Sequence, residues 1–170
     1  MKQNNFPIAY VLMVVAQILI CNYFHLSQYV VLSILPVIVL CIPTKVGTFA
    51  AMCIAFATGL SVDWLAEGVI GLNTLALVPV ALIRKDLITL IFGEELFERK
   101  EAFTIRKYGI GKVSFALLTV QALFLIIYIW ADGANLRPFS FNLLRFCLSL
   151  LAGYLLSLLV VDITAPDDRK

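Results

Sequence analysis

Apolar runs separated by short polar breaks cover almost the whole chain. Four of these runs reach the roughly 20 helical residues that a bilayer requires. Two shorter runs contain a proline each, and we expect Pro36 to kink the second span. The pattern predicts an all-α integral membrane protein with six transmembrane helices. The predicted spans are 7–24, 26–42, 46–66, 69–83, 113–131 and 141–161.

Composition agrees with this membrane class. Hydrophobic residues make up 62% of the 170 positions, and only 14% are charged. A soluble domain of this size carries roughly a quarter charged residues. No second domain or repeat is visible, so residues 1–170 are predicted to form a single compact bundle. The net charge of +2 is too small to indicate a nucleic-acid partner.

The positions of lysine and arginine predict the orientation. With six spans and both termini in the cytoplasm, the inner segments hold 11 of the 13 basic residues, and the outer side holds 2. This asymmetry follows the positive-inside rule and predicts an N-in, C-in topology. The inner basic residues are Lys2, Lys45, Arg84, Lys85, Arg99, Lys100, Arg106, Lys107, Lys112, Arg169 and Lys170, and the outer ones are Arg137 and Arg145.

The third and fourth predicted spans carry a distinctive pattern of small and polar residues. Small residues recur every four positions in the third span, forming a ridge at Gly47, Ala51, Ala55 and Gly59. Such a ridge allows a second helix to approach closely, either another span of this chain or a partner helix. A polar hairpin cluster follows at Asp63, Glu67, Gly71 and Asn73.

Carboxylates in a span are costly and need a partner, water or a function. In the predicted topology Arg145 lies at a similar depth to Asp63 and Glu67, so we hypothesise that it pairs with one of them. A proton relay through Asp63 and Glu67 is a weaker alternative.

The only sizeable polar stretch lies between the fourth and fifth spans. Residues 84–112 interleave charges with apolar side chains, which is typical of a segment lying at the membrane interface. Its basic residues follow the positive-inside rule, and they also predict a contact with anionic lipid or a cytoplasmic partner. The contact residues expected there are Arg84, Lys85, Arg99, Lys100, Arg106 and Lys107.

Catalytic and metal-binding patterns are not found in the sequence. The cysteines lie within predicted spans and form no CxxC pair, which is typical of buried thiols acting as small apolar side chains. The single histidine, His25, is more typical of a structural residue than of a catalytic one. We therefore predict no enzyme activity, no cofactor and no metal. The cysteines are Cys21, Cys41, Cys53 and Cys147.

The order of these features resembles the MreD family, six-helix proteins of the bacterial rod-shape system. The residues that carry the resemblance are Pro36, Pro43-x-Lys45-Val46-Gly47, Gly59-x-x-x-Asp63, Gly71-Leu72 and Leu75-Ala76-Leu77. The length and the polar stretch at 84–112 also fit, so the resemblance covers essentially the whole chain. One departure is Glu67, which stands where the family pattern has a glycine four residues after the aspartate.

The resemblance implies a scaffold in the bacterial inner membrane. MreD-like proteins act with the single-span protein MreC and with the actin-like MreB. Together these position a RodA-type glycosyltransferase and a class B penicillin-binding protein during cell elongation. By this resemblance Gly59, Asp63, Gly71 and Asn73 shape the hairpin between the third and fourth spans, and the small-residue ridge is a candidate partner surface.

A second function class stays open. The substrate-binding component of vitamin importers also has six helices, and the MreD family is thought to share its fold. In that alternative the outer residues Asp63, Glu67, Asn73, Trp64 and Trp130 line a small-molecule pocket. The short outer loops count against it. A proton-coupled transporter is weaker still, because no inverted repeat is visible.

Overall fold

The computed structural model describes residues 6–23, 29–93, 109–133 and 137–164, and all regular structure within these ranges is helical. The helices are α1 (Phe6–Tyr23), α2 (Leu35–Leu40), α3 (Thr48–Val62), α4 (Leu72–Phe92), α7 (Ile110–Gly133) and α8 (Phe139–Thr164). Helix α3 continues directly into a π-helical turn, η2 (Asp63–Glu67).

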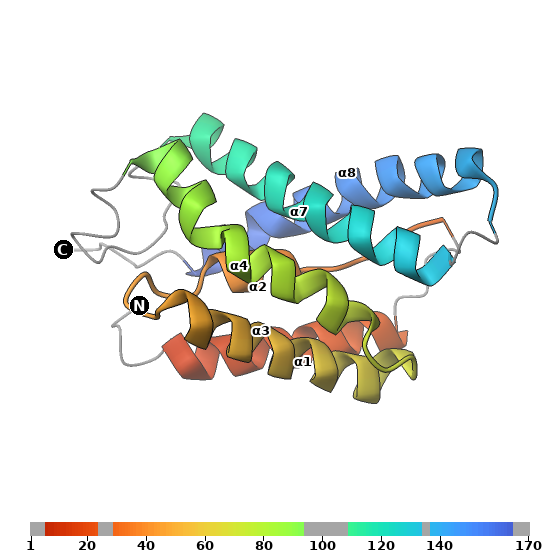
Figure 1. The fold of residues 1–170 in the computed structure, drawn as a ribbon, viewed down its shortest axis with the longest axis horizontal. Helices are drawn as coiled ribbons and strands as arrows, with labels where there is room; N and C mark the ends of the chain where they lie inside the picture. Colours follow the sequence, from red (N-terminus) through yellow and green to blue (C-terminus); the bar gives the residue numbers. More distant parts are fainter. Residues whose placement is uncertain (1–5, 24–28, 94–108, 134–136, 165–170) are drawn as a thin grey trace.

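The chain runs back and forth along the long axis of the molecule (Figure 1). Helices α1, α3 and α7 point in one direction, and α4, α8 and the stretch leading into α2 return. Neighbours in the bundle follow chain order, because α3 packs on α4, α4 on α7, and α7 on α8. The turn between η2 and α4 defines what we call the hairpin end, and the opposite end is the basic end.

The short helix α2 lies at the centre of the bundle. It contacts each of the other five α-helices that the structure describes. All six of its residues are buried, and none is more than 1% exposed among Leu35, Val37, Ile38, Val39 and Leu40. Pro36 stands in its first turn, where the missing N–H costs nothing. Helix α2 is therefore part of the hydrophobic core.

The structure corrects the expectation of a continuous helix over 26–42. Residues 30–34 are not helical and lead directly into α2, which ends at Leu40. Pro36 therefore begins a six-residue helix instead of kinking a long one. The stretch 29–34 runs through the molecule from the hairpin end to α2, as the thin orange line in Figure 1 shows.

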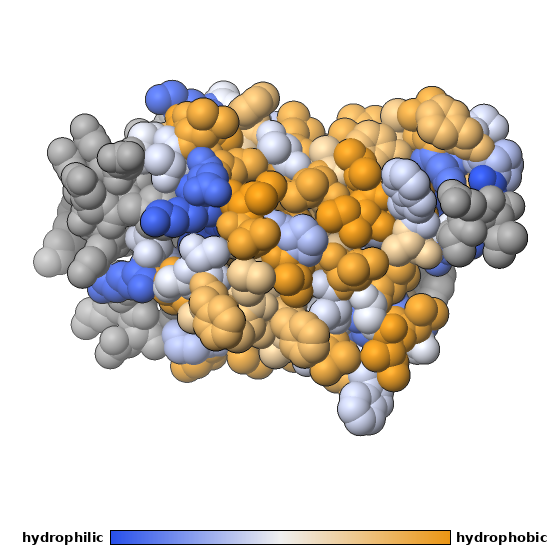
Figure 2. Space-filling view, viewed as in Figure 1, coloured by the Kyte–Doolittle hydropathy of each residue, from blue (hydrophilic) through white to orange (hydrophobic). Residues whose placement is uncertain are grey.

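Three of the described helical segments are long and apolar enough to cross a membrane, namely Thr48–Glu67, Ile110–Gly133 and Phe139–Val161. Helix α1 is apolar but shorter. Figure 2 shows a broad hydrophobic surface across the middle of one face, with hydrophilic residues concentrated toward the two ends. This distribution suits a protein surrounded by lipid along its flanks.

The two ends of the bundle expose different side chains. At the hairpin end, large aromatic residues stand on the surface: Tyr23 is 79% exposed, Trp64 74%, Trp130 68% and Phe139 80%. Aromatic residues of this kind gather at membrane–water interfaces. The basic end exposes Lys45, Lys85 and Lys112.

Candidate functional site

The hairpin between α3 and α4 is built around a carboxylate. The π-helical turn η2 is followed by its C-cap Gly68, whose N–H donates to the carbonyl of Asp63 over 2.8 Å. Gly68 and Gly71 have φ values of 70° and 100°, a region that side-chain-bearing residues rarely adopt. These two glycines turn the chain so that the first turn of α4 faces Asp63.

Asp63 is fully buried and caps the N-terminus of α4 from outside that helix. Its Oδ1 accepts hydrogen bonds from the backbone N–H of Asn73 at 2.8 Å and from Asn73 Nδ2 at 3.0 Å. Its Oδ2 accepts from the N–H of Gly71 at 2.9 Å, the N–H of Thr74 at 3.3 Å and Thr74 Oγ1 at 2.9 Å. Every partner is a donor, which is the pattern that an ionised carboxylate requires.

This cap explains how the bundle tolerates a buried acid. The first N–H groups of a helix have no partner within the helix, and the helix dipole favours negative charge there. The Asp63 carboxylate accepts hydrogen bonds from these N–H groups and places its negative charge at the N-terminus of α4, so no cation is required. The predicted members Gly71 and Asn73 of the polar hairpin cluster are thus its direct partners, and Thr74 is a further partner that sequence reasoning missed.

The structure corrects the hypothesis that Arg145 pairs with Asp63 or Glu67. Arg145 donates to Oδ2 of Asp132, and Arg137 donates to the same oxygen at 3.1 Å. Asp132 lies in the last turn of α7, beside the first turns of α8. Arg145 therefore joins α8 to α7, and its ion pair within the described residues is with Asp132 and not with Asp63 or Glu67.

Glu67 is half-buried and accepts a hydrogen bond from the hydroxyl of Tyr128 at 2.9 Å. This bond links the end of η2 to α7. The two tryptophans considered for a pocket, Trp64 and Trp130, point to the surface and stand 74% and 68% exposed. Asp63 and Asn73, in contrast, are buried and bonded to each other, with 3.0 Å between Asp63 Oδ1 and Asn73 Nδ2.

The small-residue ridge packs against α4 within the chain. Ala51 and Ala55 are fully buried, and Gly59 approaches α4 so closely that an added Cβ would lie 2.6 Å from the Cα of Thr74. Only glycine allows this contact, which brings the Asp63 carboxylate within reach of α4. Gly47 lies apart from the others, exposed at the start of α3.

The non-helical stretch before α2 receives its hydrogen bonds from side chains of three helices. Gln17 of α1 accepts from the N–H of Ile34 at 2.8 Å and donates to the carbonyl of Leu32 at 3.0 Å. Gln121 of α7 donates to the carbonyl of Ser33 at 3.2 Å, and Ser149 of α8 accepts from the N–H of Val31 at 2.8 Å. Backbone that is not helical survives at membrane depth only when protein groups satisfy it.

Arg84 has a structural role that its place in a basic segment did not indicate. It is 3% exposed, and it donates to the carbonyls of Leu40, at 3.3 Å, and Ile42, just beyond the C-terminus of α2. Helix α4 continues past it to Phe92, so residues 84–92 are helical. Lys85 is exposed, and the other expected contact residues, Arg99, Lys100, Arg106 and Lys107, lie outside the described residues.

Metal ligands do not gather in the described part of the chain, where no three His, Cys, Asp or Glu side chains come together. Of the cysteines, Cys53 and Cys147 are exposed, and Cys21 and Cys41 are half-buried. His25 lies outside the described residues. Comparison of the whole chain with protein-family models, with curated proteins and with solved structures finds no match.

Proposed function

We propose that this chain is a non-enzymatic membrane scaffold of the MreD type. In this proposal it spans the bacterial inner membrane six times with both termini in the cytoplasm. It binds an MreC-like single-span protein and thereby helps to position MreB and the peptidoglycan synthases that elongate the cell.

The observation that carries this proposal is the construction of the α3–α4 hairpin. Gly59, Asp63 and Gly71, which are part of the sequence resemblance, act together in one structural unit. Gly59 allows close approach of α4, Asp63 caps α4, and Gly71 supplies the positive φ at the cap. Because the three residues contribute to one contact between α3 and α4, they support the resemblance more strongly than three residues with unrelated positions in the fold would.

The arrangement of the two ends supports the proposed orientation. The stretch from Tyr29 through α2 and the loop that follows it connects one end of the bundle to the other, as a second crossing requires (Figure 1). Lysines stand exposed at the basic end, as the positive-inside rule expects of a cytoplasmic face. Exposed aromatic residues at the hairpin end fit the opposite interface.

We assign the partner helix to the outward face of α3. The inward ridge is occupied by α4, but a second row of small residues, Ala50, Cys53 and Ala57, lies on the exposed side of the same helix. Phe49 and Phe56 border this row and are 79% and 51% exposed. Small residues in lipid allow helix backbones to approach, and the aromatic borders add packing area.

In-cell photocrosslinking tests this assignment. A photoreactive residue at position 50 or 57 is expected to capture a single-span protein of the elongation machinery. The same probe at Leu151, exposed on α8, provides a matched lipid-facing control and is expected to give far less of that product.

Crosslinking at the buried position Ala55 is expected to stay within the chain. Equal capture of the single-span protein from α3 and α8 would contradict the assignment to α3. Capture of an energising transporter subunit in place of a shape protein would contradict the scaffold proposal and favour a vitamin-importer component.

A further inference from the structure

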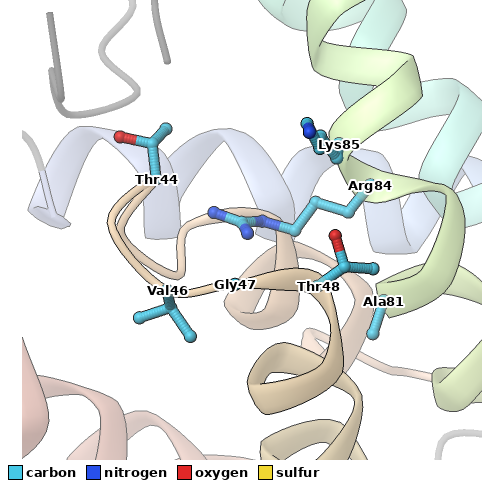
Figure 3. Close-up of a pocket in the computed structure, with 7 residues that line it drawn as sticks. All are labelled: Thr44, Val46, Gly47, Thr48, Ala81, Arg84 and Lys85. Carbon is cyan, nitrogen blue, oxygen red and sulfur yellow. The ribbon is translucent and has the colours of Figure 1, made fainter. Parts of the chain in front are cut away.

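A small cavity opens at the basic end, between the start of α3 and the middle of α4. It has a volume of about 140 Å³. Figure 3 shows that two segments build it, the loop entering α3 and the turn of α4 that carries Arg84. Its lining residues are Thr44, Val46, Gly47, Thr48, Ala81, Arg84 and Lys85.

Arg84 brings a buried positive charge to this cavity. Its guanidinium extends from α4 toward the loop that contains Thr44 and Gly47 (Figure 3). The residue is only 3% exposed, and within the described part of the chain its hydrogen bonds go to two neutral carbonyls, those of Leu40 and Ile42. Among the described residues no carboxylate pairs with it. A guanidinium has five N–H donors and a full charge, so these carbonyls leave both donors and charge uncompensated.

Two further features attract negative charge to the same place. Gly47 is the N-cap of α3 and has no side chain to satisfy the first N–H groups of this 15-residue helix. An uncapped helix N-terminus favours anions through its free N–H groups and its dipole. Lys85 follows Arg84 on α4 and is exposed, so a second cation lies at the cavity.

We propose that this cavity binds the phosphate group of an anionic ligand, held by Arg84, Lys85 and the N-terminus of α3. The Thr48 hydroxyl, which Figure 3 shows turned toward Arg84, provides an additional hydrogen-bonding group. The proposal is independent of the scaffold role, because it concerns the opposite end of the bundle from the hairpin. Both a lipid headgroup and free phosphate offer this chemistry, and the experiment distinguishes them.

Gly47 allows a test that leaves Arg84 and its bonds to α2 unchanged. Its φ and ψ of −62° and 158° suit any residue, and an added Cβ would meet nothing within 4 Å. An aspartate there caps α3 and places a carboxylate beside Arg84, so that it competes with the ligand. Gly47→Asn is the matched control, because asparagine caps a helix comparably but carries no charge.

The full chain, purified in neutral detergent, is titrated separately with phosphatidylglycerol, phosphatidylcholine and inorganic phosphate at constant ionic strength. The thermal midpoint of each variant is compared with its own ligand-free value, because a ligand that binds only the folded state raises it. Phosphatidylglycerol is expected to stabilise the wild type and Gly47→Asn, and phosphatidylcholine is not. Binding is expected to weaken about ten-fold in Gly47→Asp and about five-fold in Lys85→Gln, as for loss of one cationic contact.

The phosphate titration identifies the source of the anion. Stabilisation by phosphatidylglycerol alone assigns the site to a lipid headgroup, and stabilisation by inorganic phosphate that competes with the lipid assigns it to a soluble anion. Either result supports the anion site. Equal lipid dependence in the wild type, Gly47→Asp and Lys85→Gln would overturn it, and so would no response to any of the anions.

Discussion

At the scale of single residues, Asp63 shows how a helix N-terminus can hold a buried acid without a cation. Its two oxygens accept five hydrogen bonds from only three residues, the N-cap Gly71 and, in the first turn of α4, Asn73 and Thr74. Sequence reasoning identified Asp63 as a residue in need of a partner and expected an arginine. It missed the backbone amides, because every residue except proline has an N–H and nothing in the sequence marks which N–H groups are unpaired.

Replacing Asp63 with asparagine tests this cap. One carboxylate oxygen becomes an NH₂ group, which then faces N–H donors instead of accepting from them. We expect Asp63→Asn to lower the free energy of unfolding by about 3 kcal/mol, as for unsatisfied buried donors. Thermal unfolding in detergent measures this, with Ser61→Ala as a control, because Ser61 bonds only to its own helix and is exposed. A loss no larger than that of the control would show that the cap contributes little.

Arg145 provides a second prediction at this scale. Because it donates to Asp132, the variants Asp132→Asn and Arg145→Gln are expected to be non-additive, with a coupling energy of about 1 kcal/mol or more. The corresponding cycle between Asp63 and Arg145 is expected to give less than about 0.5 kcal/mol. The free energies of unfolding of the single and double variants give both coupling energies and show whether Arg145 pairs with Asp132 or with Asp63. The reverse order of couplings would restore the original hypothesis.

At the scale of elements, local sequence predicts the α3–α4 hairpin well but not the path of residues 29–34. The hairpin depends on Gly59, Asp63 and Gly71, which lie close together in the chain. The stretch before α2 depends on Gln17 and Gln121. Gln121 lies 88 positions along the chain from Ser33, whose carbonyl it binds. An apolar run with a helix-like composition therefore gave no sign that it would be non-helical.

Gln17 and Gln121 contribute unequally to this stretch. Gln17 satisfies one N–H and one carbonyl, whereas Gln121 satisfies one carbonyl over a longer distance. We expect Gln17→Leu to lower the free energy of unfolding about twice as much as Gln121→Leu, roughly 3 against 1.5 kcal/mol. Thermal unfolding of the two leucine variants measures the ratio. If both variants were as stable as the wild type, these side chains would not be supporting the non-helical backbone.

At the scale of the whole molecule, burial within the chain varies between helices. Half of the most apolar stretch of α7 is buried inside the bundle, against 22% for that of α8. Helix α8 therefore presents most of its apolar surface outward, including Leu151, Leu155 and Leu159, which are between 61% and 65% exposed. In a membrane protein this surface faces lipid, so exposure alone does not mark a binding face.

The proposed orientation is testable with single cysteines in an otherwise cysteine-free chain. Val69→Cys stands in the turn at the hairpin end, and Lys112→Cys stands at the start of α7 at the basic end; both positions are exposed. A membrane-impermeant maleimide added to intact spheroplasts is expected to label position 69 and not position 112. Labelling of both after lysis is the control, and the opposite pattern in intact spheroplasts would reverse the orientation.

The path of residues 29–34 has a consequence for biosynthesis. Of the side chains that satisfy this stretch, Gln17 precedes it, but Gln121 and Ser149 are synthesised much later, toward the C-terminal end of the 170-residue chain. Until then, unpaired carbonyl and N–H groups would face either lipid or the translocon. If the chain inserts as proposed, we therefore expect residues 29–34 to reach their final position only once α7 and α8 are present, so that completion of this bundle is a late, post-insertion step.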